Sequence, residues 1–313
     1  MLTIQTAAFL VLAVVSILRL RSAWKNPQAR LSWAACAVGA LALLTLGSVV
    51  PLDALDGALG GTNIIYLVQN LLATTAFWLV LQAAVIEEAD APRPRRRPWL
   101  LVLTLIATSA AFVFIDRGET TRTFFIHDNA DQLAAVLCAS FYLLGVSAIS
   151  LQLILAVRDR RAAAYWPFTL GGLLCIIACL NEIVWLFLAH TSAVDARVQA
   201  AGYALFDPFF YMGVILIVAG ILSFTVRKWN REGRVTLAIR QLSRITQRAG
   251  IAPLTAGEDP AEGDPRLTVL YDLIISIHDE VLADRLHLST RERGMVERSE
   301  ALVTRELMKS GKR

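Results

Sequence analysis

The sequence predicts an all-α polytopic membrane protein with seven transmembrane helices, an N-terminus outside the cell and a helical cytosolic C-terminal tail. The 313 residues are 56% hydrophobic, and the mean hydropathy of +0.55 is well above that of a soluble globular protein. Seven apolar runs each reach about the 17–25 residues that a membrane-spanning helix needs. The runs cover approximately residues 2–20, 31–51, 64–86, 98–115, 132–156, 164–189 and 203–226.

Basic residues between these runs predict the orientation. They are concentrated in the first, third and fifth loops and sparse in the other three. Because cytoplasmic loops carry an excess of Lys and Arg, the N-terminus is expected outside and the tail in the cytosol. The rich loops contain Arg19, Arg21, Lys25, Arg30, Arg93, Arg95, Arg96, Arg97, Arg158, Arg160 and Arg161, and the poor loops contain Arg117, Arg122 and Arg197.

Two domains are expected, a transmembrane domain over residues 1–226 and a cytosolic helical tail over residues 227–313. The tail begins with "VTLAIRQLSRITQR", in which Arg240, Arg244 and Arg248 recur at i, i+4 spacing. This spacing predicts an amphipathic helix that lies on anionic lipid headgroups.

The rest of the tail is predicted to be a linker and two helices. The linker, residues 249–265, is rich in Gly, Pro and acidic residues, which are typical of loops. Helices are expected near 266–285 and 290–309, and Ser289 or Thr290 is the candidate cap of the second.

The first of these tail helices is predicted to dock on another surface. Its apolar stripe is too wide to be left in water, so it is expected to pack on the 290–309 helix, on the membrane-proximal helix or on a second copy of itself. The stripe consists of Leu270, Leu273, Ile274, Ile277, Val281 and Leu282.

Several function classes are excluded by the sequence. It has no Gly-rich phosphate loop and no nucleophile elbow, no clustered basic face for nucleic acid, and no lysine within the seventh run for a retinal Schiff base. His278-Asp279-Glu280 resembles a histidine-kinase phosphoacceptor box, but the residues after it contain neither the Asn-rich nor the Gly-rich box of an ATP-binding domain, so a solvated histidine on a helix is expected. We therefore expect no enzymatic activity, no cofactor, no metal site and no nucleic-acid partner.

Four cysteines all fall inside the apolar runs. A disulfide framework or a zinc site needs a different spacing, with CxxC pairs or nearby histidines, so the cysteines are expected to pack as small apolar residues. They are Cys36, Cys138, Cys175 and Cys179.

An intramembrane acid is the strongest functional signal. Glu182 lies in "CIIACLNEIVWLFLAH", and counting at about 1.5 Å per residue places it in the outer third of the membrane. Asp207, Gln69 and Asn70 fall at a similar depth on two other runs, and Asn181 adjoins Glu182. We expect Glu182 to face Asp207 across the interface of runs six and seven, with Gln69 and Asn70 closing the site.

This polar layer has two interpretations. In the structural one, Glu182 is protonated or is hydrogen-bonded to Asn70, Asn181 or Gln69, and it ties three helices together. In the functional one, Glu182 and Asp207 line an outward-open cavity for a cation, a proton or a basic solute, as intramembrane acids often do. Small residues on the Glu182 face predict a helix contact and turn Glu182 inward; they are Gly171, Cys175, Ala178 and Cys179. Pro208 is expected to break the helix beside Asp207.

The segments "LRLRSAWKNPQARLSWAACAVGALALL", "LDALDGALGGTNIIYLVQNLLATTAFWLVLQAAV" and "LYDLIISIHDEVL" resemble an uncharacterised actinobacterial family of seven-helix integral membrane proteins, provisionally catalogued as transporters. Tyr271, Ile277 and Asp279 fall on matching positions of that family's tail helix. The resemblance implies a multi-pass protein of the cell membrane and marks these three residues as candidate contacts of the tail with a partner.

Two functions remain open. The first is a membrane sensor or regulator that relays an extracytoplasmic cue to its tail, which would bind a cytosolic protein or a second copy. The second is a transporter of a small solute or ion, with an outward-facing site at Glu182 and Asp207. A short match between "YLVQNLL" and "YALFDPFF", which lays Gln69 over Asp207 when a one-residue gap is allowed, favours the transporter because parallel repeats occur in transporter folds.

Overall fold

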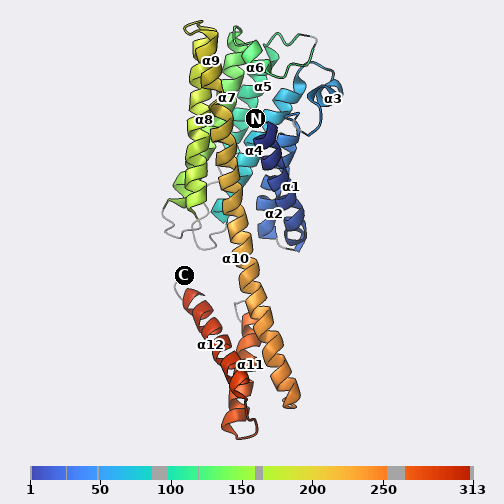
Figure 1. Ribbon diagram of the computed structural model, residues 1–313, viewed down its shortest axis with the longest axis vertical. Helices are drawn as coiled ribbons and strands as arrows, with labels where there is room; N and C mark the ends of the chain where they lie inside the picture. The colour runs from blue at the N-terminus through green and yellow to red at the C-terminus, as the bar shows by residue number, and fades with distance from the viewer. Residues whose placement is uncertain are drawn as a thin grey trace. The chain divides into compact units, whose positions relative to one another are not determined.

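The computed structural model describes residues 2–25, 27–47, 49–86, 98–118, 120–158, 165–251 and 265–310. Across these residues the chain forms twelve helices and no strand (Figure 1), which confirms the all-α prediction. The helices are α1 (Leu2–Lys25), α2 (Pro27–Leu44), α3 (Leu52–Gly57), α4 (Ile64–Ile86), α5 (Pro98–Val113), α6 (Phe125–Asp128), α7 (Leu133–Val157), α8 (Trp166–His190), α9 (Ala196–Tyr203), α10 (Phe206–Arg248), α11 (Pro265–Leu282) and α12 (Thr290–Ser310).

Five candidate spans are long and apolar enough to cross a membrane, which identifies a helical membrane protein. They are Ile4–Trp24, Ile64–Ala84, Leu133–Val157, Trp166–His190 and Arg197–Ser223. The apolar stretches of α2 and α5, Ala29–Leu44 and Pro98–Val113, are shorter. At 1.5 Å per residue, stretches of this length reach only about 24 Å of a hydrocarbon core that is about 30 Å thick.

The predicted run over 31–51 is not one helix, because the chain turns within it. Helix α2 ends at Leu44, and Gly47 adopts a positive φ of 80°, a conformation that side-chain-bearing residues rarely tolerate. Pro51 then precedes α3. The hydropathy of this run does not reveal the turn, because the residues on both sides of it are apolar.

The chain forms two compact units, Met1–Ser223 and Phe224–Arg313, whereas the sequence predicted the boundary between residues 226 and 227. The arginine-rich loops at 87–97 and 159–164, and the linker between residues 252 and 264, lie outside the described residues.

Helices α8 and α10 approach closely through small residues in the first unit. A Cβ atom built on Gly171 would lie 2.6 Å from the carbonyl oxygen of Gly213, and one built on Gly213 would lie 2.6 Å from Sγ of Cys175. Any larger side chain would push these helices apart. The predicted small-residue helix contact is therefore confirmed, and it turns Glu182 into the bundle with 7% of its surface exposed.

The short helices α3, α6 and α9 lie at one end of the first unit (Figure 1). A buried carboxylate organises part of this end. Asp56 in α3 is 0% exposed and accepts hydrogen bonds from the backbone N–H groups of Asn63 (2.8 Å) and Ile65 (3.0 Å) and from the Thr121 hydroxyl (2.8 Å). It therefore joins the first turn of α4 to the α5–α6 connection, and the acceptor position at a helix N-terminus suits its charge.

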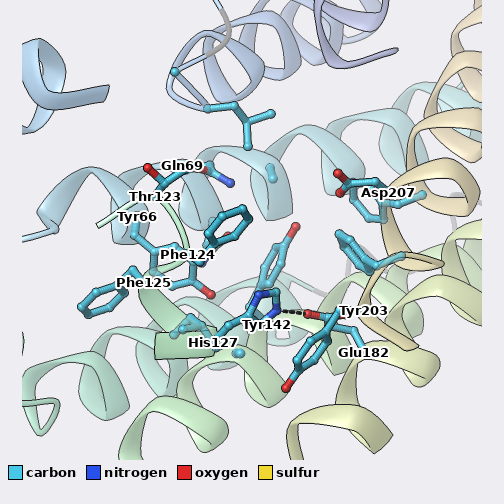
Figure 2. Close-up of a pocket in the computed structure, with 18 of the residues that line it drawn as sticks. Tyr66, Gln69, Thr123, Phe124, Phe125, His127, Tyr142, Glu182, Tyr203 and Asp207 are labelled. Atoms are coloured by element: carbon cyan, nitrogen blue, oxygen red, sulfur yellow. Dashed lines mark hydrogen bonds and ion pairs between the residues drawn. The ribbon is translucent and has the colours of Figure 1, made fainter. Parts of the chain in front are cut away.

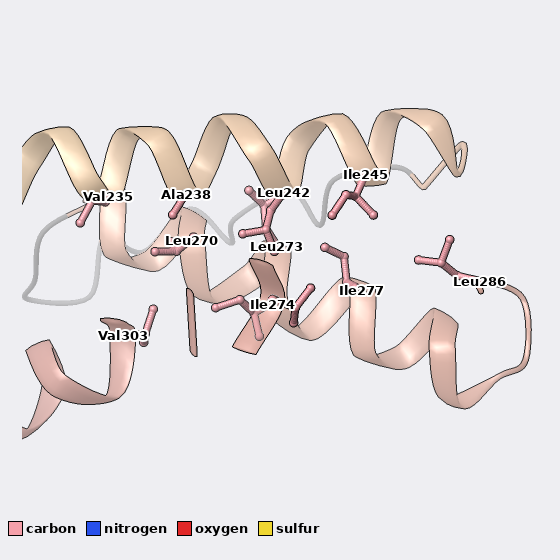
Figure 3. Close-up of a cluster of buried hydrophobic side chains, with 11 residues drawn as sticks. Val235, Ala238, Leu242, Ile245, Leu270, Leu273, Ile274, Ile277, Leu286 and Val303 are labelled. Carbon is pink, nitrogen blue, oxygen red and sulfur yellow. The ribbon is translucent and has the colours of Figure 1, made fainter. Parts of the chain in front are cut away.

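The second unit is closed by an apolar core shared by α10, α11 and α12 (Figure 3). The predicted docking of the 267–282 helix is confirmed, since it packs on both neighbouring helices. The core residues are Val235, Ala238, Leu242, Ile245, Leu270, Leu273, Ile274, Ile277, Leu286, Val296 and Val303. The apolar side of the 235–248 segment is thus covered by protein. Arg240 and Arg244 are exposed, and their contact with lipid headgroups stays a prediction.

The beginning of α12 is a capping box. The backbone N–H of Ser289 donates to Glu292 (3.0 Å), and the N–H of Glu292 donates to the Ser289 hydroxyl (3.4 Å), so two helix-end donors are satisfied reciprocally. Ser289 is therefore the cap. Arg248, the last residue of α10, pairs with the other oxygen of Glu292 at 2.6 Å.

Helix α10 is continuous from Phe206 to Arg248, 43 residues that belong to both units. Pro208 does not break it, contrary to our expectation. The proline stands in the first helical turn, where its missing N–H costs nothing, because the first N–H groups of a helix have no intrahelical partner.

Candidate functional site

A cavity of about 650 Å³ opens among the helices of the first unit. Nine helices line it, and the acids, amides and aromatic rings that face it come from different parts of the chain. The two acids are Glu182 of α8 and Asp207 of α10, the amides Gln69 and Asn70 belong to α4, and His127 comes from α6. Four of the five predicted site residues therefore line one cavity.

The side chain of Glu182 is held by a histidine. Nε2 of His127 lies 2.7 Å from Oε1 of Glu182, a hydrogen-bond distance at which the ring N–H donates to the carboxylate (Figure 2). The imidazole also stacks on the ring of Tyr203, with centroids 3.9 Å apart. The short helix α6 thereby closes on both α8 and α9.

The second oxygen of Glu182 is buried without a partner. Oε2 makes no hydrogen bond to any described residue, although it belongs to a side chain that is only 10% exposed. Buried polar atoms are nearly always paired, and a buried charged acceptor is costly to leave unsatisfied. The arrangement therefore leaves an acceptor for something that the described chain does not supply.

Asp207 does not pair with Glu182 as we expected. Its Oδ2 accepts a hydrogen bond of 3.4 Å from Nε2 of Gln5 in α1, and no hydrogen bond joins the two acids within the described residues. Figure 2 shows the Asp207 carboxylate apart from the His127–Glu182 pair. The acids share the cavity, but Glu182 is paired with an imidazole from the α5–α7 connection instead.

The two amides of α4 differ in burial. Asn70 is 2% exposed; it interacts with the Tyr66 hydroxyl, while its Nδ2 makes no hydrogen bond of normal geometry to the described residues. Gln69 is half-buried at the cavity wall. Neither amide is hydrogen-bonded to Glu182. The hydrogen bonds by which the structural interpretation joins Glu182 to α4 are therefore not formed in this arrangement.

Asn181 lies outside the cavity. Its Nδ2 donates to the carbonyl of Gly202 (3.0 Å), and its Oδ1 accepts from the indole N–H of Trp185 (3.1 Å). The bond to Gly202 joins α8 to α9, and the bond from Trp185 lies within α8. Asn181 is therefore a structural residue here, and its assignment to the site was wrong.

Sequence reasoning missed His127, Tyr203 and Gln5. The signal for His127 was a single histidine beside two phenylalanines in the longest of the loops predicted outside, "DRGETTRTFFIHDNADQ". Loop residues follow no period, so depth counting along helices could not place it. Gln5 carries no charge, and in an isolated helix nothing distinguishes it.

The three candidate contacts on the tail are placed differently from one another. Tyr271 is 49% exposed, and Asp279 is also exposed. Ile277 is 0% exposed and lies in the core of the second unit, so it stabilises the tail and offers no surface to a partner. Its assignment as a partner contact was therefore wrong for this arrangement.

The site has the composition of a binding pocket for a polar small molecule with an apolar body. Within the described ranges, no group of three or more His, Cys, Asp or Glu side chains could hold a metal ion.

Comparisons with protein-family models, with curated proteins and with solved structures find no match to this chain. The resemblance to the actinobacterial seven-helix family stays a prediction.

Proposed function

We propose that this protein is a seven-helix sensor of the cell membrane that binds a small ligand at its outer side and relays binding to its cytosolic tail. In this proposal α2 and α5 cross the membrane together with the five longer spans. The loops poor in basic residues and the helices α3, α6 and α9 face outwards. The cavity then opens towards the exterior, where a cue would arrive.

The observation that carries this proposal is the membership of α10 in both units. At its beginning, α10 presents Asp207, Phe210 and Tyr211 to the cavity. Near its end, it contributes Leu242 and Ile245 to the core of the second unit. A ligand that shifts or rotates the first turns of a continuous helix acts on both places, provided that it binds the two arrangements with different affinity.

The tail offers a surface for the output. Tyr271 and Asp279 are exposed on α11, while the apolar face of that helix is already covered within the second unit. A cytosolic protein or a second copy of the tail could therefore bind the exposed side without unfolding the core. The ligand changes this surface only if it changes the packing of α10 on α11.

A transporter is the second candidate. Gln69 and Asp207, which the weak internal repeat lays over each other, both line the cavity. Matched polar residues from two halves at one site are typical of transporters built from repeats. Transport would additionally require the cavity to open alternately to the two sides.

Labelling the tail distinguishes the two functions. The four native cysteines are buried, so spin labels attach selectively to the variants Leu237→Cys and Leu282→Cys, whose native side chains are 57% and 84% exposed on α10 and α11. In the doubly labelled protein in nanodiscs, a sensor changes its label-to-label distance distribution when ligand is added. Accumulation of ligand in proteoliposomes, with an unchanged distance distribution, would contradict the sensor and favour the transporter.

A further inference from the structure

We infer that the cavity binds a small organic primary or secondary amine in its ammonium form, an inference that rests on the proposed ligand site. The N–H groups of the ammonium donate to Oε2 of Glu182, and the apolar body of the molecule lies against the aromatic wall. His127 is a positioning residue that holds the other oxygen of Glu182.

The charges of the cavity favour a cation. Among its described lining residues, Glu182 and Asp207 are acids and Arg122 is the one arginine or lysine. Arg122 is exposed, whereas Glu182 is buried. Interaction between charges is strongest where water is excluded. For a molecule held beside Glu182, attraction to the buried negative charge therefore exceeds repulsion by the positive charge of the exposed Arg122.

The unpartnered oxygen selects a cation that carries N–H groups. Oε2 of Glu182 is buried and has no donor among the described residues, while Oε1 is already engaged by His127 at 2.7 Å. A primary or secondary ammonium brings a charged donor to this acceptor and forms a charge-assisted hydrogen bond. A quaternary ammonium has no N–H to give and would leave the acceptor unsatisfied.

The walls select a molecule with an apolar body instead of a bare inorganic ion. Calcium-like ions need six or more oxygen ligands, whereas this cavity is rich in rings. Tyr66 packs on Phe125 with ring centroids 5.5 Å apart, and Phe206 stacks on Phe210 at 5.0 Å; all four line the cavity. Ring faces attract cations and apolar groups alike.

The size of the cavity agrees with this class of ligand. Its volume of about 650 Å³ lies in the range of roughly 300–1,000 Å³ that is usual for small-molecule sites. An inorganic ion would leave most of this space to water, whereas an amine with a ring or a short alkyl chain reaches from Glu182 to the aromatic wall.

Calorimetric titration of the full-length protein in nanodiscs tests the inference with matched probes. The probes are butylamine, hexylamine, 2-phenylethylamine and tryptamine, together with the N-trimethyl derivative and the alcohol analogue of 2-phenylethylamine. We expect at least one primary amine to bind, and its trimethyl and alcohol analogues to bind roughly tenfold to a hundredfold more weakly, because each lacks part of a charge-assisted hydrogen bond.

Variants locate the site. Glu182→Gln should weaken amine binding by a similar factor of roughly ten to a hundred, and Asp207→Asn should weaken it less, since Asp207 contributes charge without an unpartnered buried oxygen. Asp128→Asn is the matched control, because this exposed acid adjoins His127 on α6 but does not line the cavity. It should leave binding unchanged.

The inference is overturned if none of the primary amines binds the parent protein, if the trimethyl or alcohol analogue binds as tightly, or if Glu182→Gln binds like the parent. The comparison among probes uses only the parent protein, so it holds even where a variant fails to fold. Amine binding without any change in the label distances of the tail would instead contradict the proposed sensor and leave the amine site intact.

Discussion

The interiors of the two units are filled in opposite ways. The first unit encloses a cavity with mostly apolar and aromatic walls, in which a buried carboxylate oxygen has no described partner. The second unit is closed by ten buried apolar residues from α10, α11 and α12 and by Leu286 of the α11–α12 connection, and its charged groups, such as Arg248 and Glu292, pair at the periphery. The first unit leaves a buried acceptor without a described donor, whereas the core of the second unit is filled by its own apolar side chains.

This difference indicates that the first unit contains the binding site and that the core of the second unit stabilises the tail. A protein interior that leaves a charged acceptor unpaired gives up stability that a hydrogen bond would supply, and such local inconsistencies are expected at functional sites. Among the described residues of the tail, no buried side-chain nitrogen or oxygen lacks a hydrogen-bond partner. We therefore expect substitutions in the tail core to act on stability, and substitutions around Glu182 to act on ligand response.

The largest expected effect breaks the tail core. Leu270→Ala removes a side chain that is 0% exposed on α11, which should cost about 2–5 kcal/mol because it leaves a cavity among α10, α11 and α12. Hydrogen exchange over residues 235–248 and 265–282 should become much faster, while exchange in the first unit stays unchanged.

Leu282→Ala on the same helix is the matched control. Leu282 is 84% exposed, so the same chemical change should alter the free energy of unfolding by less than about 0.5 kcal/mol. If both variants exchanged like the parent, the core shown in Figure 3 would not be the element that stabilises the tail.

The second effect concerns a buried carboxylate that is fully paired. Asp56→Asn should destabilise the first unit by roughly 1.5–3 kcal/mol, because an amide cannot accept all the hydrogen bonds donated by Asn63, Ile65 and Thr121. Thermal unfolding in detergent measures the loss. Asp53→Asn, at an exposed position of the same helix, is the control, and equal melting temperatures of both variants would contradict the role of Asp56.

Glu182→Gln should behave differently from Asp56→Asn, although both remove a buried carboxylate. Because Oε2 of Glu182 is unpaired, neutralising the side chain removes a desolvated charge, and the variant should be as stable as the parent or more so. Thermal unfolding without ligand is the measurement. A loss of stability as large as that of Asp56→Asn would mean that Glu182 is mainly structural.

The smallest effect is a pH dependence of the tail. The Ser289 hydroxyl and backbone N–H, together with Arg248, lower the pKa of Glu292 from 4.5 to about 2. Since the folded tail has the lower pKa, the contribution is fully present above about pH 4.5 and is lost as the pH falls towards 2.

The protection of tail amides from hydrogen exchange should therefore decrease as the pH falls from about 4.5 towards 2. In Glu292→Gln this part of the pH dependence should be absent. Ser289→Ala should cost about 1 kcal/mol at neutral pH through the lost cap. If the protection of tail amides depended on pH in Glu292→Gln as it does in the parent, the capping box would not be the source of this pH dependence.

The sequence predicted those features that follow a helical period. Glu182, Asp207, Gln69 and Asn70 were assigned to one layer because the rise per residue is constant along a helix, and all four line the cavity. The same periodicity explains why Asn181 was misassigned. Consecutive residues lie about 100° apart around a helix, so the neighbour of an inward-facing residue points elsewhere.

Features set by turns could not be predicted from the pattern. The turn at Gly47 divides a run that hydropathy alone treats as continuous, and His127 reaches Glu182 only because the α5–α7 connection folds over the bundle. Which buried oxygen stays unpaired likewise depends on tertiary geometry. Residue types indicate that an acid is present, but they do not indicate how it is paired.

The central claim is that the first unit binds an organic cation at Glu182. Hydrogen exchange of the full-length protein in nanodiscs, with and without 2-phenylethylamine, tests this claim most directly when the parent is compared with Glu182→Gln. We predict that the amine slows exchange over residues 125–128 and 196–211, which form α6, α9 and the beginning of α10 at the cavity, and that Glu182→Gln abolishes this protection. Identical protection in both proteins, or none in the parent, would contradict the claim.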